Sequence, residues 1–232
     1  MVKKIVGTGV LLVLALALQA GVKMYTLKSP DGKVKLEVTA GQGIAYSLFY
    51  DGRLLLKPSR IALHTDLPEA DHWENIRITG TKQRHVSETV QAPFYRVKEF
   101  GIDCNELELR LNNGFSLLMR AYNDGMAYRF VAGRKGEMTV VEERAEFNFA
   151  DDFEAYIPYS TNPKDPWNMA FQNFYTKAPL TQYNTELPAF LPLTVDAGAV
   201  KLTLLESDLE AYPGMFVCGD GKTPALKGVF AV

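Results

Sequence analysis

Hydrophobic and polar residues alternate with a period of two along much of the chain, most clearly between residues 105 and 130. This period is typical of half-buried β-strands, because successive side chains of a strand point to opposite faces. The alternation predicts three short strands, at Glu106–Leu111, Phe115–Tyr122 and Met126–Phe130. The two linking turns end in Gly114 and Gly125, where positive backbone φ angles are expected. A meander of this kind needs a second layer that covers its apolar face.

Similar alternation, or a short apolar run, predicts further strands on both sides of this meander. They cover residues 34–39, 44–50, 54–56, 76–79, 94–100, 138–142, 145–149, 193–195, 200–205 and 228–232. Residues 57–75 interrupt the pattern with two prolines, two histidines and Trp73, and are expected to form an irregular excursion. No stretch after residue 20 keeps the i, i+3, i+4, i+7 apolar spacing of a long helix. The sequence therefore predicts an all-β fold of antiparallel sheets.

Residues 157–192, here named the aromatic segment, break the strand pattern with six prolines among seven aromatic residues. Proline cannot donate a hydrogen bond to the ladder of a central strand, so a long Pro-rich loop is expected. Such a loop in a compact domain usually either carries function or covers a sheet. Trp167, Asn173 and Tyr175 combine rings and an amide in a way that suits sugar recognition. The alternative is that the rings only seal one face of a sandwich.

The first twenty residues differ in character from the rest of the chain. Lys3 and Lys4 precede an apolar run, Ile5–Leu18, and small residues follow. This order is typical of a secretory signal peptide, and the run is short for a bilayer span. We therefore expect cleavage after Ala20, a mature domain of residues 21–232, and export of that domain to a periplasmic or secreted location.

The composition, 47% hydrophobic and 22% charged in 232 residues, is ordinary for a soluble globular chain. Cleavage of the leader would leave 23 basic and 27 acidic side chains, and no basic patch stands out. Neither nucleic acid nor a membrane is therefore expected as a partner of the mature domain.

Cys104 and Cys218 lie far apart in the sequence, and both free thiols and a single disulfide stay open as interpretations.

The sequence lacks the common catalytic motifs, including a G-x-S-x-G elbow, a phosphate-binding glycine loop and a dedicated metal motif. Acidic residues at 142–143, 151–152 and 206–210 are interpreted as solvated strand ends and turns. The three histidines, His64, His72 and His85, are interpreted as loop residues. No catalytic residue is predicted.

Six short motifs occur in order along the chain after the leader. They are Ser29-Pro30-Asp31-Gly32-Lys33, Tyr50-Asp51-Gly52, Leu56-Lys57-Pro58-Ser59, Asn105-Glu106-Leu107, the run from Met119 to Phe130 and the run from Leu205 to Met215. Together they resemble the amino-terminal domain of glycoside hydrolase family 97, a family of bacterial α-glucosidases and α-galactosidases. The resemblance covers essentially all of the chain after the leader.

This resemblance implies a β-supersandwich of the galactose-mutarotase-like type. In complete enzymes of the family the domain precedes a (β/α)8 barrel with the catalytic carboxylates, and the present sequence has no such barrel. The resemblance also implies a calcium ion at the interface with the barrel, held in part by a glutamate of the aromatic segment. The matching position here is Gln172. Its carbonyl oxygen can ligate calcium but brings no negative charge, so weak or no binding is expected.

The primary hypothesis is a non-catalytic amino-terminal domain of an exported α-glycosidase. It would pack on the (β/α)8 barrel and shape the rim of a site for α-linked glucosides or galactosides. The apolar run that ends at Val232 is interpreted as the end of a domain from a longer protein, with a final strand tucked into a sheet as the alternative. A second hypothesis is a free-standing carbohydrate-binding module that uses Trp167 and Tyr175. A third is a sugar mutarotase, which would need a His/Glu pair in a central cleft.

Overall fold

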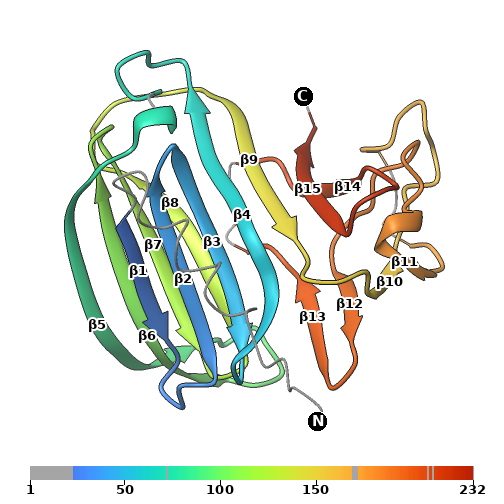
Figure 1. Cartoon of the computed structure of the whole chain (residues 1–232), viewed down its shortest axis with the longest axis horizontal. Helices are drawn as coiled ribbons and strands as arrows, with labels where there is room; N and C mark the ends of the chain where they lie inside the picture. The colour runs from blue at the N-terminus through green and yellow to red at the C-terminus, as the bar shows by residue number, and fades with distance from the viewer. Residues whose placement is uncertain (1–22, 72, 169–171, 208, 211, 232) are drawn as a thin grey trace, which may run out of the picture.

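The computed structural model describes residues 23–71, 73–168, 172–207, 209–210 and 212–231 (Figure 1). The strands in these ranges are β1 (Lys23–Lys28), β2 (Val34–Gly41), β3 (Gly43–Tyr50), β4 (Arg53–Thr65), β5 (Ile78–Gln91), β6 (Glu99–Leu111), β7 (Phe115–Tyr122), β8 (Gly125–Ala132), β9 (Val140–Asn148), β10 (Glu154–Ile157), β11 (Thr176–Pro179), β12 (Leu193–Ala197), β13 (Val200–Leu204), β14 (Met215–Gly219) and β15 (Ala225–Phe230). Two short 3₁₀ helices complete the described elements, η1 (Trp73–Asn75) and η2 (Leu180–Gln182). The predicted all-β fold is confirmed.

The strands form three antiparallel sheets. The largest has seven strands in the order β1-β2-β3-β4-β9-β15-β14, and a four-stranded sheet, β5-β6-β7-β8, packs on it. In Figure 1, β1–β4 lie in front of β5–β8, so these two sheets are the layers of a sandwich. The third sheet, β11-β10-β12-β13, lies to the right of β9 in the same view. The second layer that the predicted meander required is therefore present.

The apolar faces of the two sandwich layers meet in one hydrophobic core. Leu36 and Val38 of β2, and Leu107 and Leu109 of β6, are almost completely buried members of it. Polar residues alternate with them along each strand, so the period of two in the sequence matches the observed faces. Each fully buried leucine or valine side chain contributes about 1.5–3 kcal/mol to folding relative to an exposed one.

Nearly half of the predicted excursion over residues 57–75 is in fact a strand, since β4 runs without a break to Thr65. The register of β4 on β3 shifts so that Lys57 and Pro58 together oppose the single residue Ser47. This is a β-bulge, a position at which a sheet tolerates proline. The irregular part is limited to residues 66–75.

The strand predicted over residues 94–100 is also wrong, because β6 begins at Glu99 and residues 92–98 form the turn of the β5–β6 hairpin. The strand predicted over residues 76–79 includes only the first two residues of β5. This strand is polar on both faces, and Val86 is its one buried residue. A strand of that kind gives no alternation signal.

Of the two turn glycines in the meander, only Gly114 behaves as expected, with a φ of +85°. Gly125 has no positive φ, and that expectation is wrong. The reason is that Gly125 pairs with Tyr122 as the first residue of β8, so the turn itself consists of Asn123 and Asp124.

The predicted signal peptide, residues 1–20, lies outside the described residues. Within the described ranges, none of the helices has the length and apolar character needed to cross a membrane.

Cys104 on β6 is buried, Cys218 on β14 is half-buried, and both are free thiols. Of the two interpretations of the cysteines, the structure therefore agrees with the free thiols.

Candidate functional site

The first part of the aromatic segment is a loop that the third sheet closes. Ile157 at the end of β10 pairs with Thr176 at the start of β11, so residues 158–175 leave and re-enter this sheet at one point. We name residues 158–175 the aromatic loop. Near its base, the backbone N–H of Ser160 donates to the carbonyl of Pro188 over 2.8 Å. The sheet pairing and this hydrogen bond fix the loop at its base.

Two of the predicted sugar-contacting residues have structural partners. The half-buried ring of Trp167 meets Phe216 of β14 edge to face, with ring centroids 4.9 Å apart. The side-chain amide of Asn173 donates to the carbonyl of Tyr159 over 2.8 Å and accepts the backbone N–H of Phe174 over 2.9 Å. One N–H of Asn173 and part of the Trp167 ring surface are then left for a ligand. Both residues help to hold the aromatic loop in place.

Exposed rings lie at the carboxyl-terminal end of the aromatic loop. Phe174 is 94% exposed and Tyr175 is 46% exposed. The Tyr175 hydroxyl donates to the carbonyl of Pro192 over 3.3 Å, which ties this ring to the surface of the domain. Exposed aromatic faces beside an amide such as that of Gln172 can stack on pyranose rings. This end of the loop is the part best suited to contact sugar.

Gln172, the position implied for calcium ligation, is exposed. No group of three or more His, Cys, Asp or Glu side chains that could hold a metal ion occurs among the residues that the structure describes. Calcium takes about six to eight oxygen ligands, with carboxylates prominent among them. A single neutral amide does not provide this set, so the described residues alone do not fit a calcium ion.

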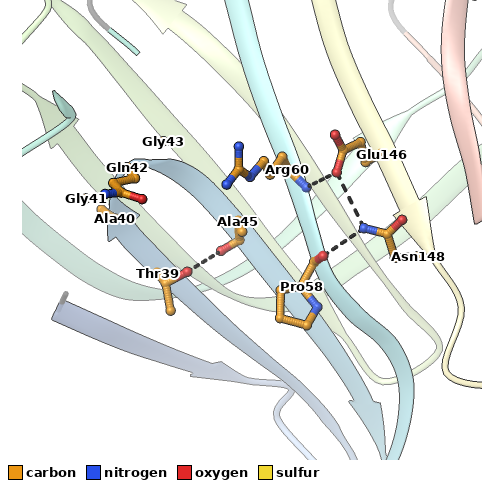
Figure 2. A pocket seen from close by; sticks show the side chains of 10 residues that line it. All are labelled: Thr39, Ala40, Gly41, Gln42, Gly43, Ala45, Pro58, Arg60, Glu146 and Asn148. Atoms are coloured by element: carbon orange, nitrogen blue, oxygen red, sulfur yellow. Dashed lines mark hydrogen bonds between the residues drawn. The ribbon is translucent and has the colours of Figure 1, made fainter. Parts of the chain in front are cut away.

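A polar pocket lies where Pro58 interrupts the pairing of β4 with β9 (Figure 2). Side chains of β9 replace the missing ladder bonds at this gap. The carboxylate of Glu146 accepts the backbone N–H of Arg60 over 3.1 Å, and the Asn148 amide donates to the Pro58 carbonyl over 2.8 Å. These residues and the turn over residues 39–45 line a pocket with a volume of about 360 Å³.

This pocket presents hydrogen-bonding groups and no aromatic ring. In Figure 2, Arg60 reaches from β4 toward the turn that carries Gln42. Glu146 is the one acid among the lining residues, and Arg144 lies 3.2 Å from its carboxylate. Hydrolysis of a glycosidic bond usually needs two facing carboxyl groups, so the pocket can hold a small polar molecule but is no glycosidase centre. Sequence reasoning missed it, although a proline inside a run of strand-forming residues was an available signal.

Two acidic residues that were predicted to be solvated are half-buried. Glu143 lies on the inner face of β9 with Ala145, and its carboxylate accepts the Tyr212 hydroxyl over 2.8 Å. Glu206 accepts the backbone N–H of Met215 over 2.8 Å. Burial raises the pKa of both carboxyl groups, and the charge of Glu206 raises the pKa of Glu143 further. The interpretation as solvated turns is wrong for this pair.

A second pocket, of about 490 Å³, lies beside β1 and brings together His85 and Glu106. Burial alone would raise the pKa of Glu106, but hydrogen bonds from Arg84 and Arg120 hold that pKa below its usual value. A carboxylate of this kind is poorly suited to accept a proton at neutral pH. The pocket therefore lacks the acid–base pair that a mutarotase requires.

Among the described residues, His64 supplies no such pair either. His64 lies on β4, and its Nδ1 atom is 2.6 Å from the carboxylate of Asp71. His72 lies outside the described residues. His64 and His85 lie on different sheets of the sandwich, and each has its own carboxylate partner, Asp71 for His64 and Asp103 for His85.

Comparisons with known proteins place these observations in a family. A family model described as Glycosyl-hydrolase 97 N-terminal matches residues 27–231. The chain is 39% identical over 223 residues to a protein of Bacteroides thetaiotaomicron named retaining alpha-galactosidase, covering 93% of this chain and 33% of that protein. It is 26% identical over 158 residues to a probable retaining alpha-galactosidase of Streptomyces bingchenggensis, covering 66% of this chain and 24% of that protein. The chain thus spans a third or less of these relatives.

Solved structures with a similar fold include a glycoside hydrolase family 97 enzyme from Pseudoalteromonas sp. strain K8 in complex with acarbose. The TM-score is 0.73 at 18% identity, over 89% of this chain and 32% of that one. A structure of a beta-arabinopyranosidase gives a TM-score of 0.76 at 20% identity, over 90% of this chain and 35% of that one. At these identities the likeness concerns the fold, and it confirms the β-sandwich predicted from the sequence.

Proposed function

The chain belongs to the glycosyl-hydrolase 97 N-terminal family, and from that premise we propose that it is a non-catalytic domain of an exported α-glycosidase. Its role is to pack on a (β/α)8 catalytic barrel and to shape the rim of the substrate site. The observation that carries this proposal is a match along nearly all of the chain to only 33% of a retaining alpha-galactosidase. The names of the relatives favour α-galactosides as the substrate class, with α-glucosides as the alternative.

The chemistry of the described pockets supports a non-catalytic role. Each of the two is lined by a single carboxylate, Glu146 in one and Glu106 in the other. Glycoside hydrolysis usually depends on two carboxyl groups on opposite sides of the scissile bond. The same proposal includes export after cleavage at Ala20. Calcium belongs to complete enzymes of the family, whereas this chain, with Gln172 at the glutamate position, should bind the ion weakly or not at all.

We expect the purified chain to release no nitrophenol from nitrophenyl α-galactoside or nitrophenyl α-glucoside, with or without calcium. The full-length retaining alpha-galactosidase of Bacteroides thetaiotaomicron serves as the positive control in the same assay. If activity co-purifies with the chain through two further columns and depends on calcium, the domain is itself an enzyme and the proposal is wrong.

A free-standing carbohydrate-binding module is the second candidate, favoured by the exposed rings of Phe174 and Tyr175 beside Gln172. The chain has two tryptophans, so the variant Trp73→Phe leaves Trp167 as its single tryptophan. Titration of this variant with melibiose and maltotriose should change the Trp167 fluorescence in a saturable way, and Tyr175→Ala should reduce the affinity about tenfold through loss of ring stacking. An unchanged signal at high sugar concentration counts against this candidate and leaves the docking role intact.

A further inference from the structure

The β5–β6 hairpin extends beyond the sheet to which it belongs. β6 pairs with β7 between Cys104 and Arg110, whereas its pairing with β5 continues as far as Glu99. Residues 87–103 therefore form a two-stranded ribbon with its turn, here named the arm, at the lower end of the sandwich in Figure 1. Its five residue pairs give it a length of about 17 Å. An isolated ribbon of two strands is only marginally stable in water, so an arm of this kind gains from a contact.

The tip of the arm, residues 92–98, exposes large apolar side chains. Phe94 is 99% exposed, and more than half of the surface of Tyr95 and of Val97 is also exposed. The ring of Tyr95 meets Phe100 edge to face, with ring centroids 6.5 Å apart. Clustered exposed apolar groups of this kind mark contacts with proteins or membranes.

Two cations alternate with these apolar side chains in the same turn. Arg96 lies between Tyr95 and Val97, and Lys98 follows directly. The backbone N–H of Ala92 donates to the carbonyl of Lys98 over 2.7 Å, which closes the turn. The Lys98 ammonium group also donates to the carbonyl of Pro93. The turn therefore holds its rings outward with positive charge beside them.

Negative charge begins directly after the tip and continues along the ribbon. The carboxylate of Glu99 accepts a hydrogen bond from the Gln91 amide over 2.9 Å at the first pair of the ribbon. Glu88 and Asp103 lie in the fourth and fifth pairs from the turn, nearer the body of the domain. The tip is thus a cationic, aromatic end of an arm whose two strands carry three carboxylates, on a chain whose net charge is −2. The arm is longer than the Debye length of about 8 Å at physiological salt, so the negative charge of the body is largely screened at the tip, and Glu99 is the one carboxylate beside it.

We propose that this tip inserts into the headgroup region of an anionic lipid bilayer. Aromatic rings concentrate at the boundary between headgroups and acyl chains, where Phe94, Tyr95 and Val97 would be buried. Arg96 and Lys98 would bind lipid phosphates at the level of the headgroups. A convex tip with alternating rings and cations matches a deformable anionic surface and requires no complementary groove.

This inference departs from the sequence-based expectation of no membrane partner after signal cleavage. That expectation came from overall charge and from the lack of a basic patch in the sequence. Two cations among the seven residues of the tip are too few to be recognised as a basic patch in the sequence. The fold places them at the end of a protruding arm together with three exposed apolar side chains, and that arrangement is visible only in three dimensions.

Co-sedimentation with vesicles tests the proposal. We expect the intact chain to bind phosphatidylglycerol/phosphatidylethanolamine vesicles, with an affinity that falls as salt is added, and to bind phosphatidylcholine vesicles about tenfold more weakly. The double variant Phe94→Ser/Tyr95→Ser should lose binding to both vesicle types at least tenfold. Arg96→Glu/Lys98→Glu should lose the preference for anionic lipid. The matched control is Val141→Ser/Leu205→Ser, which removes two other exposed apolar side chains and should bind like the parent.

Three results would overturn the proposal. The first is a parent chain that binds neither vesicle type. The second is an equal loss of binding in the Val141/Leu205 control, which would indicate general adhesion. The third is a dimer by analytical ultracentrifugation that Phe94→Ser/Tyr95→Ser dissociates, which would assign the tip to a second copy of the chain. Far-ultraviolet circular dichroism of each variant confirms that the exposed substitutions leave the fold unchanged.

Discussion

Replacement of Trp73 by alanine should lower the free energy of unfolding by about 3–5 kcal/mol, the usual cost of removing a large buried aromatic side chain. Trp73 is buried in η1, and its indole N–H donates to the carbonyl of Leu63 over 2.9 Å. Its ring also meets Phe130 of β8 nearly edge to face at 5.1 Å and lies 6.1 Å from Phe115 of β7. One side chain thus joins β4 of the large sheet to two strands of the small one.

Urea denaturation followed by circular dichroism measures this effect. Trp73→Phe keeps an aromatic ring at this position and loses one hydrogen bond, so it should lower the free energy of unfolding by only about 1–2 kcal/mol. Met24→Ala, at an exposed position on β1, is the matched surface control and should stay within about 0.5 kcal/mol of the parent. A loss below about 1 kcal/mol in Trp73→Ala would mean that η1 does not join the two layers.

The role of Trp73 shows where sequence reasoning succeeds and where it fails in this fold. The meander over residues 105–130 was predictable because local alternation and local turn chemistry agree there, and both act between neighbours in the chain. Trp73 lies in a stretch without periodicity, and its importance comes from contacts with β7 and β8, about forty or more residues away. No local pattern reports such a contact.

Strands that depend on their neighbours were harder to predict than strands with an apolar face. β5 is polar on both sides and is held by its ladder to β6, which a reading of one segment cannot detect. Pro58 argued against a central strand, yet a bulge absorbs it and β4 continues. In both cases tertiary pairing overrode the local signal.

The candidate site was predicted in part. Prolines and rings correctly indicated a loop in the first part of the aromatic segment. The expectation of a loop is wrong for residues 176–179, which form β11 with Pro179 at its end. The two hydrogen bonds of the Asn173 amide could not be foreseen, since one of its partners is fourteen residues away. The pocket at Arg60 and Glu146 was missed for a similar reason. Its residues come from β4, from β9 and from the turn between β2 and β3, which are far apart in the sequence. None of these segments taken alone carries a sequence pattern that indicates a site.

The charge network around Glu106 gives the second large expected effect. Glu106 lies on β6 between β5 and β7, and its side chain is only 5% exposed. Its carboxylate accepts Arg84 Nε over 2.5 Å with one oxygen and Arg120 Nε over 2.8 Å with the other. Arg120 also reaches the hydroxyl of Tyr122 over 3.5 Å. Removal of the central charge leaves two guanidinium groups side by side without their shared partner.

Glu106→Gln should therefore cost about 2–4 kcal/mol. Loss of one member of a buried ion pair costs about 3–5 kcal/mol, and the half-exposed Arg84 can recover part of this by turning to water. The matched control Arg84→Gln keeps the pairing of Glu106 with Arg120 and should cost less than about 1 kcal/mol. Equal losses in the two variants would contradict the assignment of Glu106 as the centre of the network.

The pH dependence separates this charge effect from a packing effect. Because the two arginines outweigh burial and hold the pKa of Glu106 below its ordinary value of 4.5, the folded state binds fewer protons there than the unfolded state. Stability from this group is therefore complete above pH 4.5 and is lost as the pH falls through the lower, folded-state pKa. The difference in the free energy of unfolding between the parent chain and Glu106→Gln should therefore become smaller in that acidic range. Glu143 and Glu206 act in the opposite sense, since burial raises their pKa values and their contribution falls as the pH rises through those values. If the difference in the free energy of unfolding stays constant down to the acid unfolding transition, the effect of Glu106→Gln comes from altered packing and not from the lost charge.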